Sequence, residues 1–307
     1  MRRHPGRLAT LIAAIGLVLC AVWPNASTAE AMPNWSLAEK PIADRVDGLR
    51  KVPDELRGNT TQSLALQIRA LPAALNKLRL AVNLAGLSTE GDLGHPVLQD
   101  VADTLAAALR EHPAPWVPLP TSDDSQFSLA HLPAYAYEEL ARLQRYEAVQ
   151  VSMADDPHYN AAMADLQAQD HKREHPHFTL TDLAGKSWTF ADLRGHVVLI
   201  NFWATWCPPC LKEIPDLQRL YERYAPQGLI ILGISDEDAA KVALFVSRKK
   251  LSYPMLLDPH RVVNNEFVVH GIPMSFVYDR SGRLVAEAMD MRTQRQLTDM
   301  LGKAGLQ

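Results

Sequence analysis

The feature that most constrains the fold is an apolar run, 196–204, that ends just before two closely spaced cysteines. The run reads HVVLINFWA, and its strand-forming residues are typical of a strand buried on both faces of a sheet. The segment 208–225 then predicts a helix. Cys207 therefore stands where a buried strand gives way to a helix, and Cys210 lies one turn into that helix.

The rest of the C-terminal half alternates strand and helix signals. A buried strand is predicted at 228–235 and a short strand at 254–258. A period-two pattern at 274–289 predicts a hairpin that turns at Ser281–Gly282. Two short strands are expected within 178–195. Helices are predicted at the ranges 237–250, 261–267 and 293–305. This order predicts an α/β domain, with a mixed sheet flanked by helices.

The N-terminal half has a different pattern. From about 36 to 170, apolar residues recur at spacings of three and four, which predicts an all-helical domain. Pro72 is expected to kink or split one of its helices. We place the helical domain and its linker at 30–173 and the α/β domain at 174–307. The helical domain is interpreted as a bundle without chemistry of its own, with partner binding as the alternative.

The first 29 residues are typical of a secretory signal peptide. Arg2, Arg3 and Arg7 precede an apolar stretch, and small residues suited to cleavage follow at Ser27–Ala29. An uncleaved anchor is the alternative, because the apolar stretch could just cross a bilayer if tilted. Cys20 lies inside this stretch and is assigned to the leader. We therefore expect an exported, periplasmic protein that is tethered to the membrane only if the leader is retained.

Composition excludes several other classes of function. The net charge of −4 gives no support for nucleic-acid binding. The nearby histidines His171, His175 and His177 could bind a metal, but no cysteine or carboxylate cluster accompanies them, so a solvated linker is the preferred interpretation. Neither a metal site nor a cofactor is expected.

The cysteine pair is better explained by reactivity than by stability. Without the leader, Cys207 and Cys210 are the only cysteines, and a bridge that closes so short a loop adds little stability. At a helix N-terminus, the unpaired N–H groups and the helix dipole favour a thiolate, so Cys207 is the expected nucleophile. Cys210 is expected to be less exposed and to resolve the mixed disulfide. Pro208 and Pro209 fit the first turn of a helix and should tune the reduction potential, in a direction that the sequence does not give.

The motif FWATWCPPC at 202–210, followed by GIP at 271–273, resembles the thioredoxin superfamily. Within it, the chain is similar to exported thiol–disulfide oxidoreductases of the TlpA/ResA type. The resemblance implies a thioredoxin-like mixed sheet and a cis Pro273 beside the cysteines. The backbone of Ile272 could then pair with an extended segment of a client protein. The resemblance also implies cysteine-containing protein clients and a membrane-bound or exported thiol electron donor.

Two further residues are assigned from the same comparison. In cytosolic thioredoxin, a buried aspartate that assists proton transfer occupies the place of Asn201, which cannot ionise. Glu213 is the candidate replacement, because it lies three residues after Cys210 on the same helical face and matches a glutamate of the ResA-type proteins. Burial would raise its pKa toward neutrality and suit it as a base for Cys210. A solvent-facing glutamate beside Lys212 is the alternative.

The residues just before the cysteines have separate predicted roles. Trp206 is expected to form an apolar contact surface for clients, and Trp203 to belong to the core. Thr205 does not fit a peroxidase, because it precedes the cysteine by two residues instead of the three of the peroxiredoxin pattern.

Three functions remain open at this point. The first is an exported dithiol reductase, for which the resemblance implies apocytochrome c maturation as the commonest task. The second is an oxidase that introduces disulfides. The third is a helical binding or scaffold protein with an appended redox domain.

Overall fold

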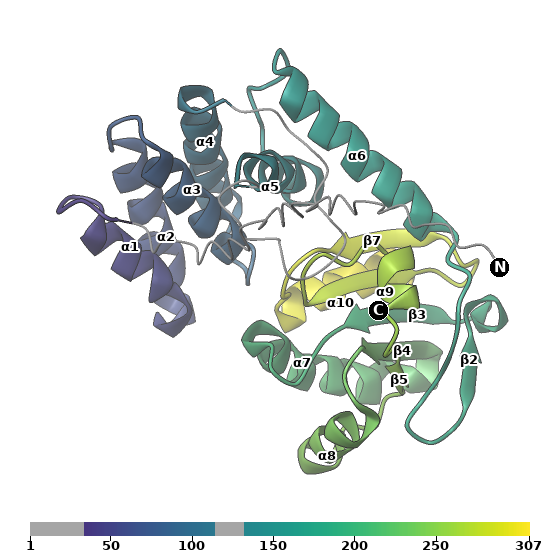
Figure 1. The fold of residues 1–307 in the computed structure, drawn as a ribbon. Helices are drawn as coiled ribbons and strands as arrows, with labels where there is room; N and C mark the ends of the chain where they lie inside the picture. Colours follow the sequence, from purple (N-terminus) through teal and green to yellow (C-terminus); the bar gives the residue numbers. More distant parts are fainter. Residues whose placement is uncertain (1–33, 114–131) are drawn as a thin grey trace, which may run out of the picture. The chain divides into compact units, whose positions relative to one another are not determined.

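The computed structural model describes residues 34–113 and 132–307 (Figure 1). The predicted signal peptide, 1–29, lies outside the described residues. Within the described ranges, no helix has both the length and the apolar character that crossing a bilayer requires.

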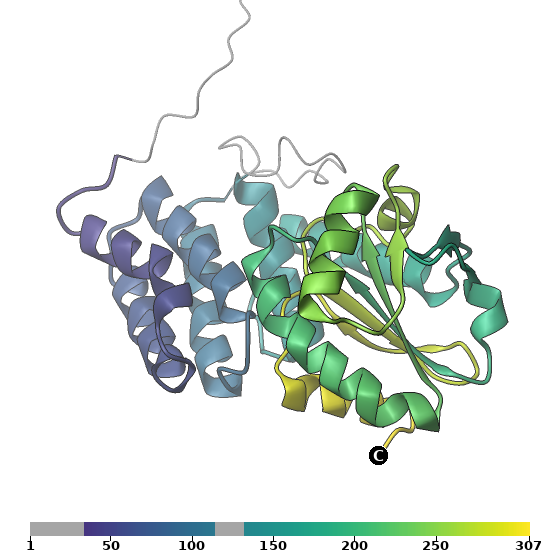
Figure 2. The ribbon, with the colours of Figure 1, turned by 90° about the horizontal axis from the view of Figure 1, so that it is seen from below.

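Helices make up the N-terminal part of the described chain, and every strand in Figure 2 belongs to the later part. We call this first part, α1 to α6, the helical half. Its elements are α1 (Lys40–Asp47), η1 (Leu49–Lys51), α2 (Asp54–Arg69), α3 (Leu75–Ser88), α4 (His95–Glu111), α5 (Leu132–Glu147) and α6 (Pro157–Glu174). Helix α2 ends before Pro72 and α3 begins after it, so the predicted split of this helical segment is confirmed.

The predicted apolar stripe forms the core of the helical half. Leu64 and Ile68 of α2 and Leu78 of α3 are fully buried, and they belong to one cluster with Leu105 of α4 and Leu140 of α5. These residues follow the three- and four-residue spacing of a helical face. The helical half therefore has a hydrophobic core of its own.

The later part of the chain, β1 to α10, is called the sheet half. Its elements are β1 (Thr179–Thr181), β2 (Ser187–Thr189), η3 (Phe190–Leu193), β3 (Val197–Phe202), α7 (Pro208–Tyr224), η4 (Ala225–Gln227), β4 (Leu229–Ser235), α8 (Ala239–Lys249), β5 (Met255–Leu257), α9 (Val262–Glu266), β6 (Met274–Tyr278), β7 (Leu284–Ala288) and α10 (Gln294–Lys303). Strands β1 and β2 form an antiparallel pair, and the main sheet has the order β5-β4-β3-β6-β7.

Strand β3 lies at the centre of this mixed sheet, parallel to β4 and antiparallel to β6. All six of its residues are buried. Val197 and Leu199 join a cluster with residues of α7 and α10, whereas Val198 and Ile200 join a second cluster with Phe267, just after α9. Helices thus cover both faces, and the predicted fold class, a thioredoxin-like mixed sheet preceded by a helical region, is confirmed.

The strand register brings two distant loops together. Phe202, the last residue of β3, pairs with Met274, the first residue of β6. The segment that leads from β3 to Cys207 and the Ile272–Pro273 segment before β6 therefore lie at the same end of the sheet.

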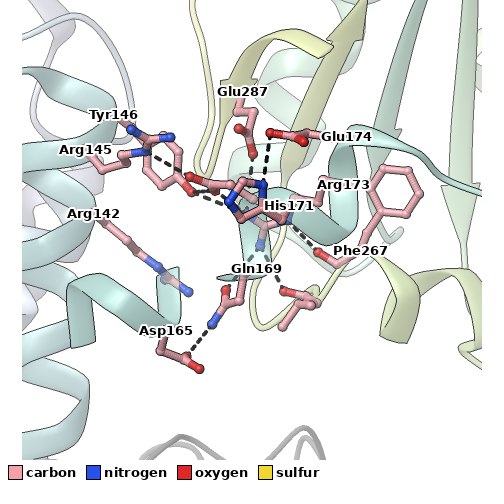
Figure 3. A network of polar contacts seen from close by, with 12 residues as sticks. Arg142, Arg145, Tyr146, Asp165, Gln169, His171, Arg173, Glu174, Phe267 and Glu287 are labelled. Atoms are coloured by element: carbon pink, nitrogen blue, oxygen red, sulfur yellow. Dashed lines mark hydrogen bonds and ion pairs between the residues drawn. The ribbon is translucent and has the colours of Figure 1, made fainter. Parts of the chain in front are cut away.

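The end of α6 is part of the interior. Arg173 is 1% exposed, and its Nε donates to the carbonyl oxygen of Phe267 at 2.8 Å. Its Nη1 lies 3.2 Å from a carboxylate oxygen of Asp170. The same nitrogen lies 3.4 Å from a carboxylate oxygen of Glu287 (Figure 3). The prediction of a solvated linker is therefore wrong for Arg173, although the nearby His171 is exposed. Because the described residues belong to one compact unit, a domain boundary at residue 174 stays a prediction.

Candidate functional site

A disulfide joins Cys207 and Cys210 at the start of α7, with an S–S distance of 1.98 Å. Cys207 is the N-cap residue, and Pro208 and Pro209 occupy the first turn as predicted. The backbone N–H of Cys210 donates to the Sγ of Cys207 at 3.2 Å. After reduction, this N–H group and the helix dipole would stabilise negative charge on that sulfur.

Both cysteines are covered in this oxidised form. Cys207 is 2% exposed and Cys210 is 1% exposed, so the expected difference between an accessible and a covered sulfur is not observed. Pro208, which follows Cys207 directly, and Trp206, which precedes it, are both exposed. Exposed residues therefore flank Cys207, which itself offers little surface to a partner in this oxidised form.

The Ile272–Pro273 peptide bond is cis, as the resemblance implied. The Sγ of Cys207 lies 3.5 Å from the carbonyl oxygen of Ile272. Pro273 is buried and Ile272 is half-buried. The structure thus brings together the predicted nucleophile and the predicted docking backbone, which are 65 residues apart in the sequence.

The segment that approaches the cis proline is held in an unusual conformation. Val268 has a φ of +53°, in the left-handed region that β-branched residues rarely occupy. The Nη2 of Arg173 lies 3.5 Å from the carbonyl oxygen of Val268. The Nε of the same side chain donates to the carbonyl oxygen of Phe267 (Figure 3). A buried arginine of the helical half therefore binds the backbone at the start of the segment 267–272, which precedes the cis proline.

The two tryptophans before the cysteines differ as predicted. Trp206 is 65% exposed, whereas Trp203 is buried. Between them, Thr205 donates from its backbone N–H and from its hydroxyl to the carboxylate of Glu237, the hydroxyl bond being 2.9 Å long. This anchor fixes the turn from which Trp206 projects.

Glu213 is buried, so the solvent-facing alternative for it is wrong. Its Oε2 accepts from Asn201 Nδ2 at 3.0 Å, and its Oε1 accepts from the backbone N–H of Arg292 at 2.7 Å. Burial raises the pKa of Glu213 to about 7, against the opposing effects of these hydrogen bonds and of the Arg292 charge. A carboxyl group with such a pKa can take up or release a proton near neutrality.

Asn201 is suited to both protonation states of Glu213. Its Nδ2 also donates to Ser275 Oγ at 3.0 Å, and its Oδ1 is buried with no hydrogen-bond partner among the described residues. The amide can donate to a carboxylate, and after rotation its oxygen can accept from a protonated carboxyl group. Asn201 occupies the place of the thioredoxin aspartate but cannot transfer a proton itself. The structure shows that it is hydrogen-bonded directly to Glu213.

A pocket of about 540 Å³ lies over the disulfide. Trp206, Cys207 and Ile272 contribute to its lining, together with Arg50 and Tyr135 from the helical half. The two halves thus share the surface through which Cys207 is approached.

Three residues at or beside this site were not found by sequence reasoning, namely Arg292, Arg50 and Tyr135. Arg292 meets Glu213 across 79 positions, and Arg50 reaches the pocket from the other half of the chain. No local spacing pattern signals such contacts. The buried carboxylate of Glu213 was the one available signal, because a buried acid needs partners.

The histidine tract does not form a metal centre in the structure as described. In residues 34–113 and 132–307, no three histidine, cysteine, aspartate or glutamate side chains converge as metal ligands.

Comparison with known proteins identifies relatives of the sheet half. The family model for the AhpC/TSA family matches residues 172–287. ResA, the thiol–disulfide oxidoreductase of Bacillus thuringiensis (strain Al Hakam), is 35% identical over 146 residues, which are 47% of this chain and 84% of that protein. ResA of Bacillus subtilis (strain 168) is 31% identical over 144 residues, or 47% of this chain and 80% of that protein.

Solved structures also align with part of the chain. One is a putative thiol:disulfide interchange protein DsbE from Chlorobium tepidum, which is 24% identical, with a TM-score of 0.41 over 43% of this chain and 96% of that one. The ResA relatives are matched over most of their own length, at more than 30% identity. The chain therefore belongs to the ResA family of thiol–disulfide oxidoreductases.

Proposed function

We propose that this chain is an exported reductase that passes two electrons from its dithiol to disulfides of protein clients, with cytochrome c maturation as its task. The observation that carries the proposal is the position of Cys207 Sγ, at the N-terminus of α7 and 3.5 Å from the Ile272 carbonyl oxygen. The task and the reducing direction follow from the family resemblance.

The proposed thiol–disulfide exchange proceeds in two steps. The thiolate of Cys207 attacks one client sulfur, so that a mixed disulfide forms and the second client sulfur leaves as a thiolate that takes up a proton. Cys210 then loses its proton to Glu213 and attacks Cys207 Sγ. The Cys207–Cys210 disulfide forms, and the client leaves with both cysteines reduced. A thiol donor restores the dithiol.

Client binding uses the surroundings of Cys207. An extended client segment that contains the disulfide would pair with the backbone at Ile272 in the manner of an added strand. Trp206, 65% exposed, would cover the apolar side chains of that segment. Arg50 and Tyr135 line the same pocket, which supports a part for the helical half in client binding.

The electron donor and the location follow from the same proposal. An exported dithiol enzyme needs reducing equivalents from a membrane-bound or exported thiol protein. We place the enzyme in the periplasm, tethered to the inner membrane if the leader is retained.

A trapping experiment tests the proposal. In Cys210→Ser, the mixed disulfide on Cys207 cannot be resolved, so covalent client adducts should accumulate in the exported fraction and disappear on reduction. The matched control is the double variant C207S/C210S, which should trap nothing. An absence of adducts in Cys210→Ser, with the protein folded and exported, would contradict the proposal.

A redox titration tests the direction of transfer. Equilibration with glutathione should give a reduction potential near or below about −250 mV for a reductase. A value near about −120 mV would indicate an oxidase instead. The reductase proposal is supported if Cys210→Ser traps client adducts and the measured reduction potential is not strongly oxidising.

A further inference from the structure

Arg292 connects the buried carboxylate of Glu213 to the helical half. It follows β7, lies just before α10 and is 6% exposed. Its backbone N–H donates to Glu213 Oε1 at 2.7 Å. The main chain of Arg292 thus fixes one oxygen of the carboxylate, while Asn201 fixes the other.

The side chain of Arg292 extends in the other direction, into the helical half. Its Nη1 donates to the carbonyl oxygen of Thr89 at 3.3 Å, just after α3. Its Nη2 forms an ion pair with Glu147, the last residue of α5, and these two side chains are 7% and 12% exposed. Thr89 also donates from its hydroxyl to Asp290 at 2.7 Å, so the 290–292 segment is held at two points.

We propose that Arg292 is a positioning residue, through which the helical half holds Glu213 one turn along α7 from Cys210 and couples that carboxylate electrostatically to Glu147. The inference rests on the proposed function, because it concerns the proton acceptor of the same exchange reaction. It also gives the helical half a part in the chemistry, in addition to its share of the pocket.

The charges around Glu213 determine the sign of the coupling. Burial and the charge of Asp216 raise the pKa of Glu213, whereas the backbone hydrogen bond and the guanidinium charge of Arg292 lower it. Burial raises the pKa of the Tyr253 phenol, and the charge of Glu213 adds to this rise, so Tyr253 is also among the groups that interact with Glu213. Among these groups, Arg292 is the one whose side chain forms an ion pair with the helical half.

Other charged groups lie around the Arg292–Glu147 ion pair. Burial raises the pKa of Glu139 to about 8, and the charge of Glu147 contributes to this rise. Asp290 is influenced by Arg292, and burial raises the pKa of Asp290 to about 6. The charges of Glu90, Glu138 and Arg142 also act on one or both of these acids. These groups are common to every variant below, so a comparison between variants isolates the Arg292–Glu147 pair.

The test uses the opposite charges of the pair in the full chain. Arg292→Gln removes a positive charge, so the pH midpoint of Glu213 should rise. Glu147→Gln leaves the charge of Arg292 unbalanced, so the midpoint should fall. Each shift should be about half a pH unit or more, and the double variant should return toward the wild type. The midpoint is read from the pH profile of thiol–disulfide exchange and from the 13C resonance of the Glu213 carboxyl group.

The matched control is Asp92→Asn. Asp92 pairs with Arg295 and also links the two halves, but at the surface, where the side chains are 32% and 66% exposed. This variant should leave the midpoint unchanged. Melting temperatures of all variants separate a loss of stability from a change in proton affinity. If Arg292→Gln folds poorly, Arg292→Lys provides a second test. This variant keeps the positive charge, so its midpoint should lie close to that of the wild type.

Two results would overturn the inference. One is no change of midpoint in folded Glu147→Gln, and the other is a shift in the same direction for Glu147→Gln and Arg292→Gln. Trapping in the Cys210→Ser background separates this failure from failure of the proposed function. If adducts form and the midpoints do not move as stated, the positioning role alone is wrong.

Discussion

The guanidinium of Arg173 contacts the carbonyl oxygen of Val268, which joins the last turn of α6 to the segment that leads into the cis proline. Val268 has a left-handed backbone conformation. The same buried guanidinium also binds the carbonyl oxygen of Phe267 (Figure 3). A backbone conformation of this kind persists only where surrounding contacts impose it. Arg173 is one such contact.

Replacing Arg173 by Lys should therefore loosen the docking loop while keeping the positive charge. We expect the free energy of unfolding to fall by about 1–3 kcal/mol, because buried carbonyl groups lose their donor. The KM for a protein client should rise more than the KM for a small aromatic disulfide. His171→Ala, an exposed position on the same helix, is the control. If the KM values for the two substrates changed by the same factor relative to the wild type, Arg173 would contribute to stability but not to client docking.

Replacing Trp206 by Ala should weaken client binding without destabilising the fold. The side chain is 65% exposed, so its removal leaves no cavity, but an aromatic anchor at the centre of an interface can be worth about 2 kcal/mol or more. We expect at least about a tenfold increase in the KM for a protein client. Leu244→Ala, at a 53% exposed position on α8, should have no effect on KM. A similar loss in both variants would contradict a specific role for Trp206.

Replacing Glu213 by Gln should remove a titration near neutrality from the exchange reaction. The pKa of the buried carboxyl group is raised to about 7, so the wild-type rate of mixed-disulfide resolution should increase as pH rises through that value. The variant should lose this dependence and resolve slowly throughout. Stopped-flow measurement between pH 5.5 and 8.5 provides the profile. A profile that matches the wild type would exclude Glu213 as the proton acceptor.

Stability should also depend on pH, because four carboxyl groups among the described residues have raised pKa values. Burial raises the pKa of Glu139 to about 8, of Glu213 and Glu287 to about 7, and of Asp290 to about 6. Each group binds its proton more tightly in the folded state, so its contribution is complete below the unfolded pKa and is lost as pH rises through the folded pKa. The melting temperature of the oxidised protein should therefore be lower at pH 8.5 than at pH 5.5.

A variant isolates this effect from other titrations. Burial lowers the pKa of His270, and this opposes the trend because it favours the folded state as pH rises. Glu287→Gln removes one of the four groups and leaves the histidine in place. The fall in melting temperature between pH 5.5 and 8.5 should be smaller in this variant, and an unchanged fall would exclude Glu287 as a contributor.

The elements that follow local patterns could be predicted from the sequence. The apolar run before Cys207 became the central strand, Pro72 separated two helices, and the alternating residues before and after Ser281–Gly282 formed a hairpin. Pro273 was identified from its motif and is cis. Each of these features depends on neighbours in the chain or on a family motif.

The buried charges could not be predicted in this way. Arg173 stands among histidines and a lysine, and its sequence context is the same for a solvated helix end as for a buried one. Arg292 and Glu147 form their ion pair across 145 positions of the sequence, between the two halves of the chain. Whether a charged side chain is buried depends on distant partners that compensate the loss of water, and a single sequence does not show them.

The buried ion pairs shared between the halves also affect how the enzyme can be studied. A chain that starts at β1 would keep Glu287 and Arg292 but lose their partners Arg173 and Glu147. Breaking a buried pair costs about 3–5 kcal/mol, a large part of the 5–15 kcal/mol that ordinarily keeps a domain folded. An excised redox fragment is therefore expected to be fragile, and slow turnover by it would measure damage at the cut surface more than the catalytic power of the intact enzyme.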